Sequence, residues 1–261
     1  AYLFNMKDKI YRRGALNIVA PSSWTEKCAG ESPLMNRFPV TRIPNGLDAE
    51  AFHPIDRAEA RLRIGIDPAK KVIMFAAHIL DDNPRKGGDV LLEAVRRLEN
   101  PERYLLMLVG EGGRDWARQT SMEVRLMGFV SKPDDLAKIY SAADVVAIPS
   151  AVENLPNVLI EALACGRAVV ASDAGGMRDG VRHMKTGYLA KPGDATDFAN
   201  GLRLVLNDET LKDNMEAKSH RLFEERFTGE KEITQLLRLY RIVIADFNAA
   251  RVQSGRSQRG S

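Results

Sequence analysis

The chain has 261 residues, of which 44% are hydrophobic and 28% charged, a composition that suits one large or two small globular domains. No apolar run approaches the length of a membrane span, and the first residues show no signal-peptide pattern. The net charge of +3 is too small to indicate a nucleic-acid partner.

The cysteines and histidines give no metal-binding pattern. Cys28 and Cys165 are far apart and have no metal-ligand neighbours. We expect both to be reduced, buried small residues rather than a disulfide, as in a cytoplasmic protein. The four histidines show no HExxH or other ligand spacing. We therefore expect neither a metal site nor a cofactor.

The first segment, 1–43, is predicted to contain a helix, a strand at 15–20, a helix at 22–36 and a strand at 40–43. This is too little chain for a domain, and the order of its elements is that of the closing portion of an α/β unit. From the usual size of a domain, we expect roughly a hundred or more residues of that unit to lie upstream. Residues 44–54 ("PNGLDAEAFHP") follow, and their Pro, Asn-Gly and Pro mark an interdomain connection.

From about Lys71 onward, short apolar runs alternate with amphipathic stretches. The predicted strands are 72–77, 104–110, 124–130, 144–150 and 168–172. The predicted helices are 88–99, 134–143, 156–164 and 195–206. Continuous apolar strands separated by helices indicate a parallel sheet that is covered on both faces. We therefore predict an α/β, doubly wound parallel sheet, Rossmann-like, in a domain that spans 55–228.

The last segments differ from this domain. Residues 229–249 are predicted to form one helix, because apolar residues recur there at helical spacing and need an apolar surface to cover. These residues are Ile233, Leu236, Leu237, Tyr240, Val243, Ile244 and Phe247. Residues 250–261 are rich in Ser, Gly and Arg and are predicted to be a disordered tail.

A first candidate site follows strand 144–150. Ligands of open α/β sheets bind outside the carboxyl ends of the strands, so we expect Glu153 and Asn154 in that crevice. Asn154 is a good helix N-cap and Pro156 suits a first turn, so the free N–H groups of the helix would face the crevice and suit a phosphate. Glu161 comes nearly two turns later. Taken alone, each glutamate is more simply a loop residue or an exposed helical residue.

Two neighbouring patterns support a site there. The segment "NPRKGG" (83–88) follows the first strand of the domain, so Arg85 and Lys86 would face the same crevice and suit a diphosphate. Two glycines at 175–176 indicate a close approach of backbones or a tight turn.

Together these segments resemble the C-terminal, donor-binding half of the two-domain (GT-B type) retaining glycosyltransferases of the large group 1 family. The matching motifs are "IPNGLDAEAFHP", "RKGGDVLLEA", "LVGEGG", "MGFVSKPDDLAKIYSAADVVAIPS", "ENLPNVLIEALACGRAVVASDAGGMRDGV" and "TGYLAKPGD". The likeness covers nearly the whole chain. The glutamate pair, with its alanine-rich helix and the following "GG", is the most specific element.

The resemblance implies a role for each matching residue. Glu161 would hold the ribose hydroxyls of a sugar nucleotide, and Glu153 would contact the hydroxyls of the donor sugar. Arg85 and Lys86 match the basic pair that neutralises the leaving diphosphate, which makes a metal unnecessary. Together with Glu153 they form the expected catalytic set.

Further substrate contacts follow from the same resemblance. Amides around Asn154, Leu155 and Pro156 would face the diphosphate, and backbone near Phe129 and Val130 would meet the edge of the base. One departure concerns the end of the first strand, where the family often has Gly-Arg and this chain has Ala77 and His78. His78 lies near the expected crevice and joins the substrate-binding candidates, while Arg85 would supply the missing charge.

The resemblance thus implies a hexosyltransferase-like enzyme of polysaccharide or glycoconjugate biosynthesis. Its partners would be a UDP or GDP sugar, a carbohydrate or lipid-linked acceptor, and an N-terminal domain that carries the acceptor surface. Front-face attack would retain the anomeric configuration without a covalent nucleophile. Two alternatives remain open: a sugar-nucleotide epimerase of the same architecture, and a non-catalytic nucleotide-binding module.

The expected location is the cytoplasm, with one further alternative. Four basic residues near the start would allow a peripheral contact with an anionic membrane surface, although charge on a solvated helix explains them better. They are Lys7, Lys9, Arg12 and Arg13.

Overall fold

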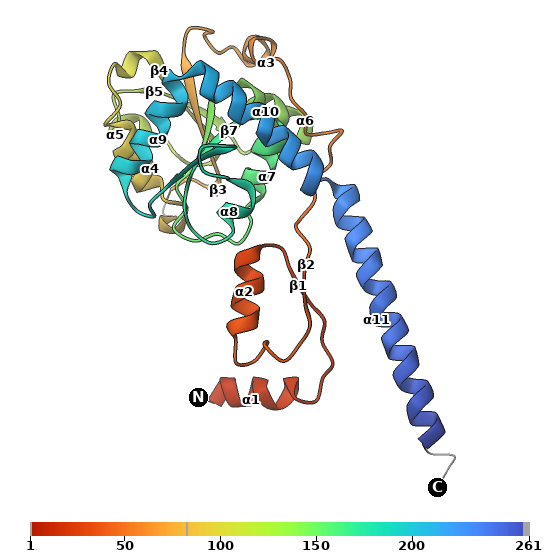
Figure 1. The fold of residues 1–261 in the computed structure, drawn as a ribbon. Helices are drawn as coiled ribbons and strands as arrows, with labels where there is room; N and C mark the ends of the chain where they lie inside the picture. Colours follow the sequence, from red (N-terminus) through yellow and green to blue (C-terminus); the bar gives the residue numbers. More distant parts are fainter. Residues whose placement is uncertain (1, 82, 258–261) are drawn as a thin grey trace.

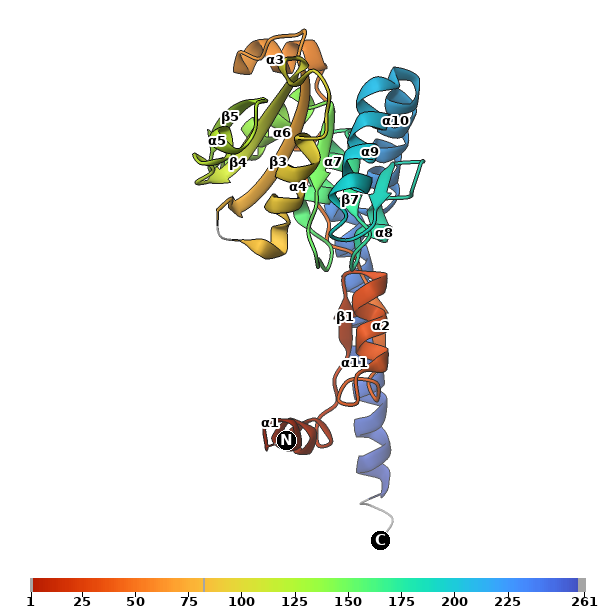
Figure 2. The same cartoon turned by 90° about the vertical axis from the view of Figure 1, so that its left-hand side faces the viewer.

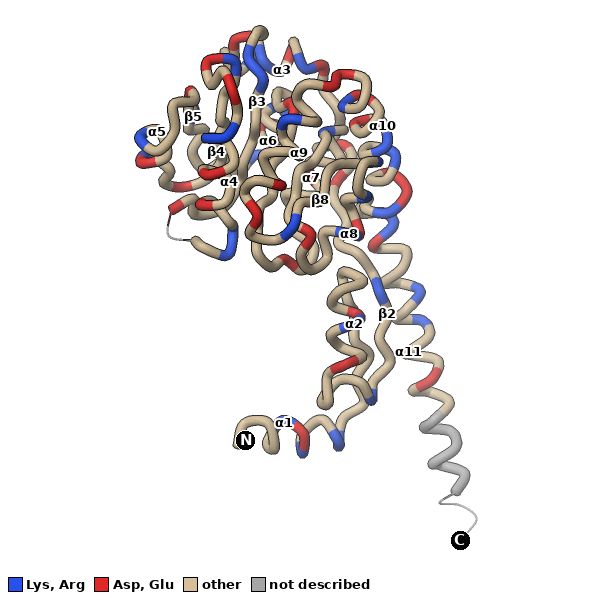
Figure 3. Tube along the Cα trace, turned by 60° about the vertical axis from the view of Figure 1, so that its left-hand side comes forward, with Lys and Arg blue, Asp and Glu red and all other residues tan. Residues whose placement is uncertain are grey.

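The computed structural model describes residues 2–81 and 83–257, and their side chains up to residue 249. Figure 1 shows a large sheet domain, a small N-terminal unit below it, and a long C-terminal helix that leaves the domain and runs past that unit. No helix among the described residues is long and apolar enough to cross a membrane. Basic and acidic residues are interspersed over the sheet domain (Figure 3).

The sheet has six strands, all parallel, in the order β5-β4-β3-β6-β7-β8. They are β3 (Lys71–Ile79), β4 (Tyr104–Glu111), β5 (Glu123–Gly128), β6 (Val145–Ile148), β7 (Ala168–Ser172) and β8 (Gly187–Ala190). The strand order reverses between β3 and β6, which is the switch point at which doubly wound sheets bind ligands. The predicted α/β class and parallel sheet are confirmed.

Both faces of the sheet are buried, because strand side chains alternate between two apolar clusters. In β3, Val72 and Met74 belong to one cluster, and Ile73 and Phe75 belong to the other. The first cluster contains residues of α3 (Arg57–Ile64), α6 (Pro133–Ala142), α7 (Asn157–Ala164), α8 (Met177–Gly180) and α10 (Glu209–Arg226). The second contains residues of α4 (Gly88–Val95), α5 (Trp116–Gln119) and α9 (Ala195–Asn207).

Several elements differ from the prediction. Strand β8 was missed because its four residues begin with a glycine and form too short an apolar run. Helix α10 was missed because its buried side includes Lys212 and Ser219 beside Met215 and Phe223, which hides the apolar period. Strand β5 ends at Gly128, where φ is 69°, instead of reaching residue 130.

The N-terminal unit consists of α1 (Tyr2–Tyr11), β1 (Ile18–Ala20), α2 (Ser23–Glu31) and β2 (Val40–Arg42). The two strands form a separate parallel sheet. The side chain of Ser22 caps α2 by accepting a hydrogen bond from the N–H of Thr25. Helix α2 ends five residues before its predicted end at 36, because Ser32 precedes a proline and lies outside the helical region.

The two chain crossings between the unit and the domain lie side by side. In the connection 44–54, the N–H of Leu47 donates to the carbonyl of Phe227 at 2.8 Å, and the N–H of Gly229 donates back to Leu47 at 2.9 Å. The final helix, α11 (Gly229–Ser257), then passes beside the N-terminal unit (Figure 2). A cavity of about 240 Å³ lies between β2 and α11, lined by Thr41, Gln235, Arg238, Leu239 and Ile242.

Two expectations need correction. The helix predicted for 229–249 continues to Ser257, so most of the predicted disordered tail is helical, in keeping with the good helix propensity of the stretch "AARVQ". The last four residues of that tail, 258–261, lie outside the described residues. Both cysteines are free, but only Cys165 is buried, because Cys28 lies on the exposed side of α2.

Candidate functional site

The loops that follow β3 and β6 meet at the switch point of the sheet. After β3 the chain forms the short 3-10 helix η1 (Pro84–Lys86) before α4, and after β6 it runs through 149–156 into α7. The ammonium of Lys86 lies 2.6 Å from Oε1 of Glu153, and the two side chains are 30% and 14% exposed. The structure therefore joins two of the three residues predicted as catalytic in one partly buried ion pair.

Backbone contacts hold these loops together. The N–H of Ala151 donates to the carbonyl of Arg85 at 2.9 Å. Gly87 has a φ of 71°, and a Cβ there would overlap the carbonyl of Pro149, so the turn before α4 needs glycine. The side chain of Arg85 is exposed and makes no hydrogen bond or ion pair within the described part of the chain.

The two glycines at 175–176 lie directly against the loop that carries Glu153. The N–H of Gly176 donates to the carbonyl of Glu153 at 3.0 Å. A Cβ on Gly175 would overlap that carbonyl, and a Cβ on Gly176 would overlap the carbonyl of Asn154. The expected close approach of backbones is confirmed.

Asn154 is not the N-cap of the following helix. Helix α7 begins at Asn157 and its cap residue is Pro156, which has no side-chain hydrogen bond to offer. Oδ1 of Asn154 instead accepts a bond from the hydroxyl of Ser22 at 2.8 Å, and a second from the hydroxyl of Thr25. The prediction was wrong because the helix starts later and a contact distant in sequence uses the Asn154 amide.

The start of α7 nevertheless keeps free donors. Leu155 and Pro156 are buried and place the first turn of the helix at the end of the loop. In the described residues, no group accepts a hydrogen bond from the N–H of Asn157 or Val158. Free N–H groups at a helix start carry partial positive charge and suit an anion.

Glu161 lies on α7 and has a partner that the sequence did not reveal. The hydroxyl of Tyr140, on α6, donates to Oε2 of Glu161 at 2.6 Å. Burial raises the pKa of Glu161, and the bond from Tyr140 opposes this shift. Burial, followed by the charge of Glu161, raises the pKa of Tyr140 well above its ordinary value of 10.0.

Two of the remaining predicted residues, His78 and Phe129, are in contact. The rings of His78 and Phe129 form an edge-to-face pair with centroids 5.3 Å apart, and Phe129 is 57% exposed. A register shift between Ala76 and Ile79 interrupts the pairing of β3 with β4 at His78. Phe129 and Val130 also line a cavity of about 400 Å³ with residues of α6.

The model of the family described as "Glycosyl transferases group 1" matches residues 70–208, which is more than half of the chain. The chain belongs to this family. Among curated relatives, D-inositol 3-phosphate glycosyltransferase of Rhodococcus jostii is 33% identical over 228 residues, 82% of this chain and 49% of the relative. The enzyme of the same name from Stackebrandtia nassauensis is 38% identical over 185 residues, 65% of this chain and 41% of the relative. The chain thus spans about half the length of the curated relatives it matches.

Solved structures share the fold of this group 1 glycosyltransferase chain. Sucrose-phosphate synthase from Thermosynechococcus elongatus is 27% identical, with a TM-score of 0.76 over 88% of this chain and 59% of that one. Anabaena HepE in complex with UDP and glucose is 24% identical, with a TM-score of 0.74 over 90% of this chain and 66% of that one. The likenesses support the GT-B type of domain.

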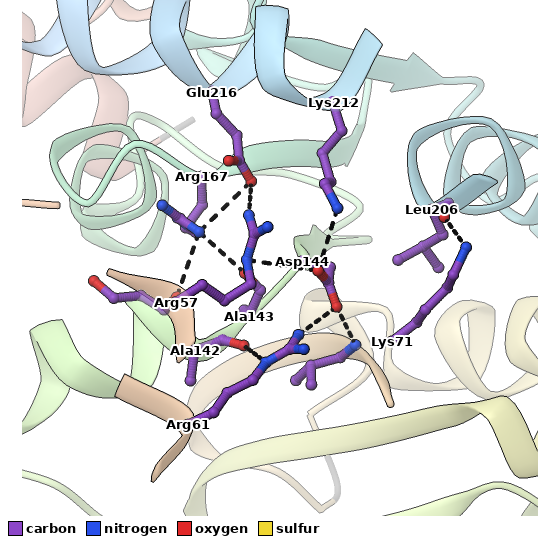
Figure 4. Close-up of polar contacts among 12 residues, drawn as sticks. Arg57, Arg61, Lys71, Ala142, Ala143, Asp144, Arg167, Leu206, Lys212 and Glu216 are labelled. Atoms are coloured by element: carbon purple, nitrogen blue, oxygen red, sulfur yellow. Dashed lines mark hydrogen bonds and ion pairs between the residues drawn. The ribbon is translucent and has the colours of Figure 1, made fainter. Parts of the chain in front are cut away.

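At the opposite end of the sheet, this member of the family buries a cluster of charges (Figure 4). Asp144, just before β6, accepts bonds from Arg61 at 2.6 Å and from the N–H of Val72 at 2.7 Å. Arg57 and Lys212 lie 3.5 and 3.4 Å from its other oxygen. The cluster joins α3, the amino ends of β3 and β6, and α10, so it fixes the helix that leads into α11.

The charges in this cluster keep Asp144 ionised. Burial pushes the pKa of Asp144 up, but the charge of Arg61, the N–H of Val72, and then Arg57 and Lys212 outweigh it. The net pKa lies below its ordinary value of 3.8. The cluster lies at the amino ends of β3 and β6, whereas the switch-point loops follow the carboxyl ends of these strands. We therefore assign the cluster a role in stability.

Proposed function

We propose that the chain is the donor-binding half of a retaining glycosyltransferase and binds the nucleoside diphosphate of an activated sugar. The observation that carries the proposal is the ion pair of Lys86 with Glu153 at the switch point, beside the free N–H groups that begin α7. A cation and a helix start together attract a diphosphate, and a carboxylate beside them accepts sugar hydroxyls.

In this proposal Lys86 stabilises the charge that grows on the leaving diphosphate. An ammonium has three donors, and Glu153 uses one of them, so two remain for phosphate oxygens. Arg85, exposed on the same turn, adds a second charge. Stabilisation of a leaving group by fixed charges is commonly the largest contribution to such a reaction. These cations would replace a metal ion.

The nucleoside would lie along neighbouring strand ends. Glu161 would accept the ribose hydroxyls, and the amides around Leu155 would face the phosphates. The edge-to-face pair of His78 and Phe129 would border the base. HepE has been solved with UDP and glucose and shares the fold, which makes UDP the first nucleotide to test.

Transfer itself would need an N-terminal domain. The chain spans about half of its curated relatives, and α11 presents exposed apolar residues such as Ile233, Tyr240 and Ile244 beside the small N-terminal unit. We propose that these residues cover the rest of an N-terminal domain that supplies the acceptor surface. The acceptor would be a carbohydrate or a lipid-linked carbohydrate, and the place of action the cytoplasm or its membrane surface.

The test is calorimetric titration of this chain with UDP, GDP, ADP and their sugar conjugates, each in EDTA and again with Mg²⁺. We expect one nucleotide to bind in EDTA with nearly the affinity found in Mg²⁺. Binding that appears only with Mg²⁺ would contradict the role given to Lys86 and Arg85. If none of the nucleotides binds, the donor-binding proposal itself is wrong.

Product analysis separates the alternatives. Once a sugar nucleotide binds, incubation with it distinguishes an epimerase, which changes the sugar and keeps the diphosphate bond, from a transferase, which releases the nucleoside diphosphate. A protein of the full length of the relatives is needed for this experiment. Tight binding without either product would favour the non-catalytic module.

A further inference from the structure

The two oxygens of the Glu161 carboxylate have different surroundings. Oε2 accepts the hydroxyl of Tyr140 at 2.6 Å. No described group donates to Oε1. If this oxygen were buried, it would be a buried polar atom without a partner, but among the described residues the only such side-chain atom is Oγ of Ser172. Oε1 of Glu161 is therefore not fully buried, and a carboxylate oxygen can accept two hydroxyl bonds through its two lone pairs.

Tyr140 is held firmly enough to act as a support. Its side chain is 0% exposed and belongs to the apolar cluster that also contains Leu159 and Leu163 of α7. A buried ring of this size has no space for another rotamer. The hydroxyl thus has a fixed position, and the oxygen that it binds is fixed with it.

We infer that Tyr140 is a positioning residue, which holds one oxygen of Glu161 so that the other faces the ribose of the donor. The inference rests on the proposed function, in which Glu161 binds ribose, and names the group that makes this carboxylate rigid. Because a hydroxyl bond to a carboxylate is charge-assisted, it also favours the ionised form.

Among the groups near Glu161, the hydroxyl of Tyr140 is the main one that stabilises the negative charge of this carboxylate. Cys165, at the end of α7, has its pKa raised by burial to about 12 and stays neutral. On α10, His220 bonds to the carbonyl of Ala164, and Lys212 and Glu216 are engaged in the cluster around Asp144. Removing the Tyr140 hydroxyl should therefore raise the pKa of Glu161 further above its usual range.

The test is the variant Tyr140→Phe, which keeps the ring and removes only the hydroxyl. Calorimetry would measure UDP, or whichever nucleoside diphosphate binds the unaltered chain, at several pH values from 5 to 8. We expect an affinity loss of about tenfold at neutral pH, typical of one charge-assisted bond. The loss should grow toward pH 5, because the raised pKa of Glu161 makes the variant carboxyl protonate first.

Three controls distinguish positioning from general damage. Inorganic pyrophosphate lacks ribose, so its affinity should not change. Tyr104→Phe, at a buried tyrosine at the amino end of β4, should leave UDP binding unchanged. In a chain that already carries Glu161→Gln, the further change Tyr140→Phe should have little effect on UDP affinity, because the carboxylate it supports is gone.

Each outcome decides the inference. Equal affinity and equal pH dependence in Tyr140→Phe and the unaltered chain would overturn it. An equal loss for UDP and pyrophosphate would also overturn it and show a purely structural role. If the unaltered chain binds pyrophosphate but no nucleotide, the proposed function fails, and the inference fails with it.

Discussion

Lys86 and Glu153 are 67 positions apart in the sequence and form a 2.6 Å ion pair across the point where the strand order reverses. Each residue comes from a loop at the carboxyl end of a strand, and those strands, β3 and β6, are neighbours. The pair thus links the basic loop to the loop that begins α7. A diphosphate bound there, as proposed, would meet both charges at once.

The first prediction concerns the cation of this pair. Lys86→Met keeps most of the side-chain length and removes the charge, so nucleoside-diphosphate affinity should fall about tenfold, or about 1.4 kcal/mol. Calorimetry measures the loss. Lys70→Met is the matched control, because Lys70 also forms an ion pair, with Glu123 at 3.0 Å, but precedes β3 at the other end of the sheet. Equal affinities in the two variants would contradict the role of Lys86.

The second prediction concerns the glycine below Glu153. Gly175→Ala would place a Cβ onto the carbonyl of Glu153, so the loop must move and nucleotide binding should fall at least tenfold. Calorimetry and thermal unfolding are measured together. Gly193→Ala is the control, because Gly193 also has a positive φ, 74°, but no atom within 4 Å of its Cβ position. If both variants are less stable but keep their affinity for the nucleotide, the strain of alanine at a positive φ explains the lost stability. The Glu153 loop would then not be displaced, and the prediction would be wrong.

The third prediction concerns the buried cluster. Asp144→Asn leaves the buried Arg61 without a counter-charge and takes one of two acidic partners from Lys212, which keeps Glu209 at 2.6 Å. The free energy of unfolding should therefore fall by about 3 kcal/mol or more. Urea denaturation measures it. Asp135→Asn, at an exposed pair with Lys138, should change stability far less.

The pH dependence of this difference follows from the lowered pKa of Asp144. A carboxyl group whose folded pKa lies below its unfolded value of 3.8 stabilises the protein at every pH above that value. Its contribution is lost as the pH falls through the folded pKa. The stability gap between the unaltered chain and Asp144→Asn should therefore stay constant from neutral pH to about pH 5 and narrow below about pH 4. A gap that narrows already near neutral pH would contradict this assignment.

The sequence predicts those features that depend on local pattern. The apolar runs give five of the six strands, and the rule that ligands lie at strand ends puts Lys86 and Glu153 in one crevice. Tyr140 could not be found in this way, because its hydroxyl faces a helix 21 positions further along the chain. Nothing in a buried, helical "IYSAA" distinguishes a tyrosine that fills space from one that supports a carboxylate.

Asn154 and α10 show a second limit. A capping rule places Asn154 on α7, but a competing contact with Ser22 of the N-terminal unit uses the same oxygen, and only the folded chain decides between them. In α10, a lysine on the buried side breaks the apolar period, and its pairing with Asp144 is visible only in three dimensions. Tertiary contacts thus override local rules where polar groups are buried.

The last prediction concerns the contact that attaches α2 to the sheet domain. Asp179 is almost fully buried and accepts bonds from both the N–H and the hydroxyl of Ser23, at 2.9 and 2.7 Å. Asp179→Ala removes both bonds, so amides of α2 and β1 should exchange their hydrogens about tenfold faster or more, while those of β3 keep their protection. Arg178→Ala, next to it but paired with the loop residue Asp173, is the matched control. Hydrogen-exchange mass spectrometry measures both variants.

The loop at Asn154 should also exchange faster, because Ser22 holds that residue from the start of the same helix. Unchanged exchange in α2 would contradict this role of Asp179 and mean that other contacts, such as those of Ser22 and Thr25 with Asn154, keep the N-terminal unit in place.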